Sequence, residues 1–232
     1  SCKKHRLVAA AILFGTYVLG CQNDVIEGTV HDIRGEPLPG VVVAGEGTGF
    51  QTLTNASGQY RVRCRPGPVR LHFAKTGYTP GLLELTVPEQ GSMQALPVQL
   101  WRLPPNKGVF LFEAFRYRAA KPVECETLRT TEGNVLYGTG KYRLDRPDAV
   151  FTSNAKPVLL CYNMPSHGAR LHRLELAEIL LADAGIGTKV TVWLPRAEHP
   201  VSLLPIDEPQ ALLQEIALAN PLEPGTYAVH WG

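Results

Sequence analysis

The chain has 232 residues with 23 Lys and Arg against 21 Asp and Glu, and three of the basic residues lie within the first six positions. The remainder therefore has no basic surplus, which argues against a nucleic-acid partner. Its 19 prolines and 22 glycines separate short apolar runs, a pattern that favours many short strands over long helices.

The first 20 residues have the pattern of a secretory signal. Lys3, Lys4 and Arg6 precede an apolar run from Leu7 to Gly20, which is shorter than the roughly 20 residues that a membrane-spanning helix needs. The alternative is a buried N-terminal helix of the folded protein, but it does not explain the basic start and the abrupt change to polar residues. We expect residues 1–20 to be a signal peptide.

The end of this run, Val18-Leu19-Gly20-Cys21, resembles the lipobox of bacterial lipoproteins. The resemblance implies cleavage before Cys21, a diacylglycerol on its sulfur and an acyl chain on the new amino terminus. One acyl chain binds a membrane only marginally, whereas several hold a protein stably. Residues 21–24 would be a short lipidated tether. Gln22 in place of aspartate favours the outer membrane, on its periplasmic or surface side.

Residues 25–103 alternate between β-prone runs and turn signals. Gly58 closes one turn, where it can adopt a positive φ without steric cost. About seven strands at this spacing predict an antiparallel sandwich. The expected strands are 25–32, 41–44, 50–54, 59–64, 69–74, 82–87 and 96–101. The expected inward residues are Val30, Val42, Leu53, Tyr60, Val62, Leu71 and Phe73.

Within these residues the sequence resembles the carboxypeptidase regulatory-like domain. The matching residues are Gly28, Val30, Asp32, Gly35, Pro37 to Val41, Thr52, Thr54, Gly58, Tyr60, Pro66, Gly67, Gly77 and Tyr78. The resemblance implies a transthyretin-like sandwich and, by itself, no activity. Such domains accompany zinc peptidases, and also transporters, adhesins and other surface proteins. Asn55 replaces the usual aspartate, and the arginine-rich strand at 59–64 is unusual for the family.

Residues 104–108 form a short linker that its prolines hold extended. The remaining residues, 109–232, resemble no family and predict a second β-rich domain. The expected strands lie at 108–117, 149–153, 157–163, 189–195, 201–206 and 223–231, with a hairpin at 134–144. Two segments, 169–185 and 208–220, have helix-forming composition, but their apolar spacing leaves helix and strand both open.

No catalytic or cofactor motif stands out, and we expect no cofactor and no metal. His172 and Glu175 match an H-x-x-E zinc spacing, but nothing selects a third ligand between His199 and His230, and a catalytic zinc needs three. Cys161 lies in an apolar run, where the pKa of a thiol rises, so we expect it to be structural rather than nucleophilic.

Four arginines form a candidate site for an anionic ligand. Arg61, Arg63 and Arg65 alternate with the apolar residues of one strand and therefore project from its outer face. If the turn at 65–68 makes a hairpin, Arg70 and His72 join them on that face. Acidic neighbours such as Glu84 would instead neutralise this face. A site there would bind lipid headgroups, lipopolysaccharide phosphates or an acidic glycan.

The cysteines divide by position. Cys2 leaves with the signal and Cys21 is the lipidation site, so Cys64, Cys125 and Cys161 remain. Both Cys125 and Cys161 lie in β-prone runs of the second domain, and we predict a disulfide between them. Cys64 is then a buried free thiol.

The sequence thus predicts a lipid-anchored cell-envelope protein that binds or assembles with protein or glycan partners and has no catalytic activity. Three tryptophans, at 101, 193 and 231, are candidates for stacking on sugar rings, although tryptophan is more often part of a core. The alternative is an accessory subunit or a processing enzyme for envelope peptides or polysaccharides, with its site in the second domain.

Overall fold

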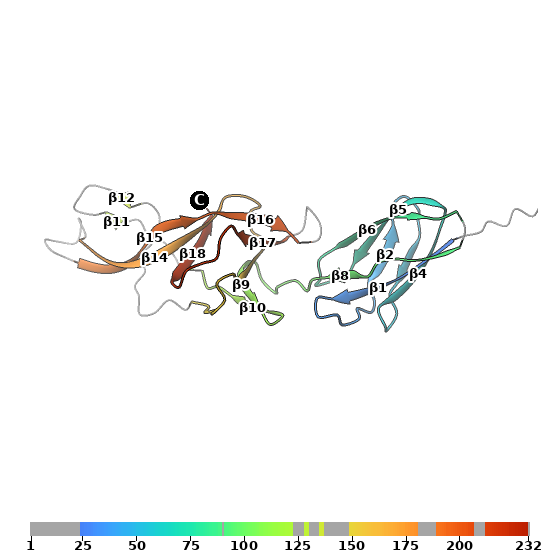
Figure 1. Cartoon of the computed structure of the whole chain (residues 1–232), viewed down its shortest axis with the longest axis horizontal. Coiled ribbons are helices and arrows are strands. Elements are labelled where there is room, and N and C mark those ends of the chain that lie inside the picture. The colour runs from blue at the N-terminus through green and yellow to red at the C-terminus, as the bar shows by residue number, and fades with distance from the viewer. Residues whose placement is uncertain are drawn as a thin grey trace, which may run out of the picture.

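The computed structural model describes residues 24–89, 91–122, 128–129, 135–136, 149–180, 189–206 and 212–231. All regular elements in these residues are β-strands, and they form two bodies that follow one another along the chain (Figure 1). The mainly β fold predicted from the sequence is confirmed. No helix in the described part of the chain is long and apolar enough to cross a membrane. The expected signal peptide and Cys21 lie outside the described residues.

The first body is a sandwich of two sheets. In one sheet, β1 has β4 antiparallel on one side and β7 and β8 parallel on the other. The second sheet is antiparallel throughout, with the order β3-β2-β5-β6. The sandwich is confirmed, but it is not purely antiparallel. Its strands are β1 (Asp24–Asp32), β2 (Val42–Gly45), β3 (Gln51–Leu53), β4 (Gln59–Cys64), β5 (Gly67–Ala74), β6 (Gly81–Val87), β7 (Ser92–Gln94) and β8 (Val98–Leu100).

Apolar side chains from both sheets meet in one core. Five of the seven residues expected there are buried: Val30, Tyr60, Val62, Leu71 and Phe73. The other two were assigned to the wrong face, because Val42 is only half-buried and Leu53 is 59% exposed. Val41 and Val43 fill the core in place of Val42. A run of three valines has no alternation from which the inward face can be chosen.

The segment between β4 and β5 does not make the predicted hairpin. β4 pairs with β1 in one sheet, whereas β5 pairs with β2 and β6 in the other, so the chain crosses between sheets at Arg65 and Pro66. Pro66 and Pro68 lack the N–H groups that a ladder next to this turn would use. The expectation that Arg70 and His72 share a face with Arg61 and Arg63 is therefore wrong.

The second body contains two main sheets and a short ribbon. One sheet has the order β10-β9-β13-β17-β16, and the other has β14 between β15 and β18. Among the described strands, β11 and β12 pair with each other alone. The strands are β9 (Gly108–Glu113), β10 (Arg116–Ala119), β11 (Leu128–Arg129), β12 (Val135–Leu136), β13 (Val158–Tyr162), β14 (Ala169–Leu180), β15 (Lys189–His199), β16 (Val201–Pro205), β17 (Leu213–Leu218) and β18 (Thr226–Trp231).

Both segments of undecided type contain strands. β14 lies within 169–185 and is paired on both sides, and β17 lies within 208–220. Tertiary pairing therefore outweighs local helix propensity here. The strand expected at 149–153 is wrong, because those residues join no ladder. Most of the hairpin expected at 134–144 lies outside the described residues.

The two bodies meet at an aromatic contact. Trp101, just after β8, has its ring 5.3 Å from that of Phe112 in β9, and Tyr117 in β10 lies 5.1 Å from Phe112. The Tyr117 hydroxyl donates a hydrogen bond of 2.6 Å to the carbonyl of Arg102. These contacts bring the first hairpin of the second body against the last residues of the sandwich.

Candidate functional site

The outer side of β4 carries the exposed arginines that the alternation predicted. Tyr60, Val62 and Cys64 are buried, whereas Arg61 and Arg63 are exposed on the opposite face. Arg65, just after the strand, is exposed too. We call Arg61, Arg63 and Arg65 the arginine edge, because β4 is the outermost strand of its sheet.

Within the part of the chain that the structure describes, Arg61 is the one member of the arginine edge that has an acidic partner. Arg61 faces Glu27 across the ladder, and its Nε lies 3.2 Å from Glu27 Oε1. Arg63 faces Val25 instead. Among the described residues, neither Arg63 nor Arg65 has an ion-pair partner. Within the described residues, the edge therefore carries positive charge that no ion pair neutralises.

Arg70 does not belong to this site. It projects from β5 in the other sheet, where its Nε lies 2.6 Å from Glu84 Oε1 and its Nη1 lies 3.6 Å from Glu46 Oε2. The acidic neighbours raise the pKa of Arg70 further above its ordinary value. His72, also on β5, lies 3.7 Å from the same Glu46. The neutralised face considered from the sequence thus exists at Arg70, and Glu84 is its main acid.

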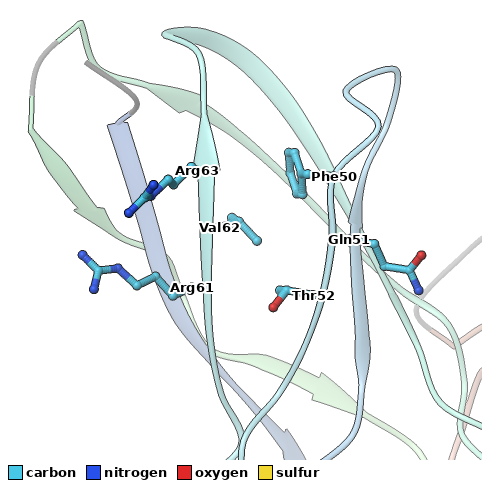
Figure 2. A pocket seen from close by; sticks show the side chains of 6 residues that line it. All are labelled: Phe50, Gln51, Thr52, Arg61, Val62 and Arg63. Carbon is cyan, nitrogen blue, oxygen red and sulfur yellow. The ribbon is translucent and has the colours of Figure 1, made fainter. Parts of the chain in front are cut away.

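A shallow groove of about 340 Å³ lies beside the arginine edge, between the two sheets. It separates β4 from β3, which is the outermost strand of the second sheet. Phe50, Thr52 and Val62 point into the space between the strands, while Arg61 and Arg63 extend from the far side of β4 (Figure 2). Sequence reasoning missed this groove, because it arises from two strands that do not pair with each other.

The second body contains a pair of facing histidines. His230 Nε2 in β18 lies 3.0 Å from His172 Nδ1 in β14, and the two rings are stacked. Glu198 Oε2 lies 3.8 Å from His172 Nε2 and 3.9 Å from Arg170. Partial burial lowers the pKa of His230, electrostatic interactions with the neighbouring His172 and Arg170 lower it further, and Glu198 partly offsets them by raising it.

From this histidine pair we predict that the second body loses folding stability at acidic pH. Because the folded pKa of His230 lies below its unfolded value, the stabilising contribution is present above about pH 6.5 and is lost as the pH falls through both values. We expect the melting temperature of the second body to fall more between pH 7 and pH 5 in the native chain than in the His230→Gln variant. Equal slopes for the two proteins would contradict this.

The H-x-x-E pair does not assemble into a metal site. His172 lies near Glu198 and His230, whereas Glu175 pairs with Arg196, so the two residues have different partners. His199 aligns with Leu171 and packs on Tyr227, away from His172. In the described part of the chain, no group of three or more His, Cys, Asp or Glu side chains is placed to hold a metal.

The described cysteines are buried within strands. Cys64 and Cys161 are both buried free thiols, and for Cys64 this confirms the prediction. Burial raises the pKa of the Cys161 thiol to about 11, so it is poorly suited to act as a nucleophile. Its proposed disulfide partner, Cys125, lies outside the described residues, and that pairing stays a prediction.

The tryptophans do not share a surface. Trp101 packs at the junction between the bodies. Trp193 aligns with Leu176 and Trp231 with Ala169, positions that lie about 23 Å apart along β14 at 3.3 Å per residue. Trp231 Nε1 also donates a hydrogen bond to the carbonyl of Pro165. A common platform for a sugar chain is therefore absent from these three residues.

Comparison with known families identifies the first sandwich. Residues 25–100 match the carboxypeptidase regulatory-like domain, as the sequence motifs predicted. The second body lies outside this match. A comparison with curated proteins gave no match.

Comparison with solved structures gives only distant similarity. A type II cohesin–X-dockerin complex from Acetivibrio cellulolyticus has 14% identity over 34% of this chain and 58% of that chain, with a TM-score of 0.30. A protein from Bacteroides uniformis with a proposed carbohydrate-binding role has 9% identity, coverage of 90% and 99%, and a TM-score of 0.28. Shaft pilin SpaA from Lactobacillus rhamnosus GG has 12% identity, coverage of 91% and 87%, and a TM-score of 0.25. TM-scores this low do not establish a shared fold.

Proposed function

We propose that this chain is a non-enzymatic binding and assembly module of the bacterial cell envelope. It is held at the outer membrane by lipid on Cys21, and its arginine edge binds an anionic protein or glycan. The observation that carries the proposal is the unneutralised charge of Arg63 and Arg65, next to an open groove on the outermost strand of the sandwich.

The position of the edge suits a partner at the membrane surface. Arg63 and Arg65 lie at the end of β4 that pairs with the beginning of β1, since Cys64 aligns with Asp24. Because Cys21 is only three positions before Asp24, a lipid on Cys21 would keep these arginines close to the bilayer surface. A basic residue near an anionic surface contributes about 1 kcal/mol, and salt at physiological strength screens the attraction beyond roughly 8 Å.

Removing Arg63 should weaken binding to anionic material. We expect Arg63→Gln to reduce the affinity of the chain from Gln22 onward about fivefold for phosphatidylglycerol vesicles, alginate or polyglutamate at low salt, as the loss of about 1 kcal/mol implies. High salt should release the native chain from all three. Cosedimentation or retention on the immobilised polymers measures this.

The matched control is Arg70→Gln, which removes the same charge from the opposite sheet. Because Arg70 is neutralised by Glu84 and Glu46, its loss should leave binding unchanged. Equal effects of the two substitutions would point to net charge alone and argue against a site at the arginine edge.

The lipid anchor is tested separately. Cys21→Ser removes the sulfur that would carry the diacylglycerol, so we expect no incorporation of labelled fatty acid and release from the membrane fraction. Metabolic labelling of the full chain measures this in cells. Equal labelling of the native and Cys21→Ser proteins would refute the anchor.

A further inference from the structure

The free edge of β4 can accept another strand. β4 pairs with β1 on one side only, and no strand in the described part of the chain pairs with its other side. β3 also ends its own sheet, and the groove separates the two (Figure 2). Backbone N–H and C=O groups along such an edge are a template for a further strand.

The residues around this edge differ between its two faces. On the outer face, Arg61 and Arg63 would be the neighbours of an added strand. On the inner face, Phe50, Thr52 and Val62 line the groove. Side chains of a strand point alternately to the two faces. A strand added at this edge would therefore place every second side chain near an arginine and the others in the groove.

We propose that the ligand of this edge is an extended polypeptide segment in which acidic and apolar residues alternate, and that it joins the first sheet as a strand beside β4. The proposal rests on the proposed anionic partner and specifies its class. A lipid headgroup or an acidic sugar would use the arginines, but it could not form a ladder with the free backbone edge of β4, which begins after Gln59 because Asn55 already bonds Gln59.

Charge also selects against a second copy of this chain. If β4 of one molecule paired with β4 of another, arginines would face arginines across the new ladder, and like charges opposite one another are destabilising. The same arginines attract carboxylates placed on the outer face. An acidic segment satisfies both conditions.

The opposite side of the sandwich is closed by hydrogen bonds. Thr79 N–H donates to the carbonyl of Trp101 at 2.7 Å, and Trp101 N–H donates to Thr79 Oγ1 at 2.9 Å. These bonds connect the segment before β6 to the residue after β8 and so link the two sheets. The groove between β3 and β4 is thus the open side to which we assign the ligand.

Synthetic peptides of about eight residues test the proposal by fluorescence polarisation with the chain from Gln22 onward. One alternates Glu and Val, one has the same composition with all Glu before all Val, and one alternates Lys and Val. A fourth is the Glu–Val peptide with N-methyl groups on alternate residues, which block a β-ladder and keep the charge. We expect the alternating acidic peptide to bind at least about tenfold more tightly than the other three.

Variants of the chain locate the peptide. Arg63→Gln should weaken binding of the alternating acidic peptide, and Arg70→Gln should leave it unchanged. Equal binding of the blocked-order or N-methylated peptide would overturn the strand proposal. Binding of alginate or vesicles without binding of any peptide would also overturn the strand proposal. That result would leave the anionic site intact and would mean that the arginines prevent further strands from pairing with the edge. Loss of arginine dependence for every anionic probe would overturn the proposed function as well.

Discussion

Replacement of Tyr60 by alanine is expected to destabilise the first sandwich by about 3–5 kcal/mol, the usual cost of removing a large aromatic side chain from a core. Tyr60 is only 3% exposed, and its ring packs edge-on against Phe73 at 5.4 Å. It also lies directly over Gly28, where an added Cβ would collide with the tyrosine ring. Urea unfolding of residues 22–104, which contain the whole core cluster, measures the loss.

Tyr60→Phe is the matched control. It keeps the ring and removes a buried hydroxyl that has no hydrogen-bond partner among the described residues. Because no hydrogen bond is lost, we expect the free energy of unfolding to stay within about 1 kcal/mol of the native value. A Tyr60→Ala protein as stable as Tyr60→Phe would show that the ring does not contribute to the core as placed here.

The second large effect is expected from Gly58→Ala. Gly58 has a φ of 69°, a left-handed conformation that costs other residues about 1–2 kcal/mol. A Cβ there would also collide with the carbonyl oxygen of Val30 and approach the Leu38 nitrogen to 3.1 Å. Overpacking of this kind adds about 1–3 kcal/mol. The urea midpoint of residues 22–104 should fall accordingly.

Gly47→Ala separates the two costs. Gly47 has a φ of 67°, but nothing lies within 4 Å of the position its Cβ would occupy. It should therefore show the conformational cost without the collision. Equal shifts of the urea midpoint by the two substitutions would contradict the predicted collision between a Cβ at position 58 and the Val30 carbonyl oxygen.

Local patterns were sufficient to predict that the first body is a sandwich, but not which of its strands pair. Alternation placed Tyr60, Val62 and Cys64 inward and the arginines outward, and the burial of β4 follows it residue by residue. The turn residues around Gly58 marked where strands end. The faces of Val42 and Leu53 were wrong because the apolar run 41–44 fits either orientation, and the choice depends on which neighbours the sheet supplies.

The second body was less predictable because its order comes from distant pairings. β14 has helix-forming composition, yet β15 and β18 pair with it on both sides. The turn after β9 uses Ala114 and Phe115 with φ values of 49° and 59°, where a two-residue turn usually has Asn and Gly. No turn signal in the sequence marked that hairpin.

Only part of the candidate site could be predicted from the sequence, because the rest depends on pairings between distant strands. The exposed arginines follow from one strand, but the absence of Arg70 from that face depends on the sheet to which β5 belongs. The groove depends on the spacing of two unpaired strands. His172 and His230 are 58 positions apart, and their contact requires the β14–β18 register.

The parallel pairing of β1 with β8 has a mechanical consequence. The chain enters the sandwich at the start of β1 and leaves it at the end of β8, and Val30 to Asp32 align with Val98 to Leu100. Tension between these two ends would pull the strands in opposite directions along their length and load their hydrogen bonds together, in shear. Antiparallel end strands would instead be peeled apart one bond at a time. The sandwich is therefore suited to transmit force between the start of β1 and the second body.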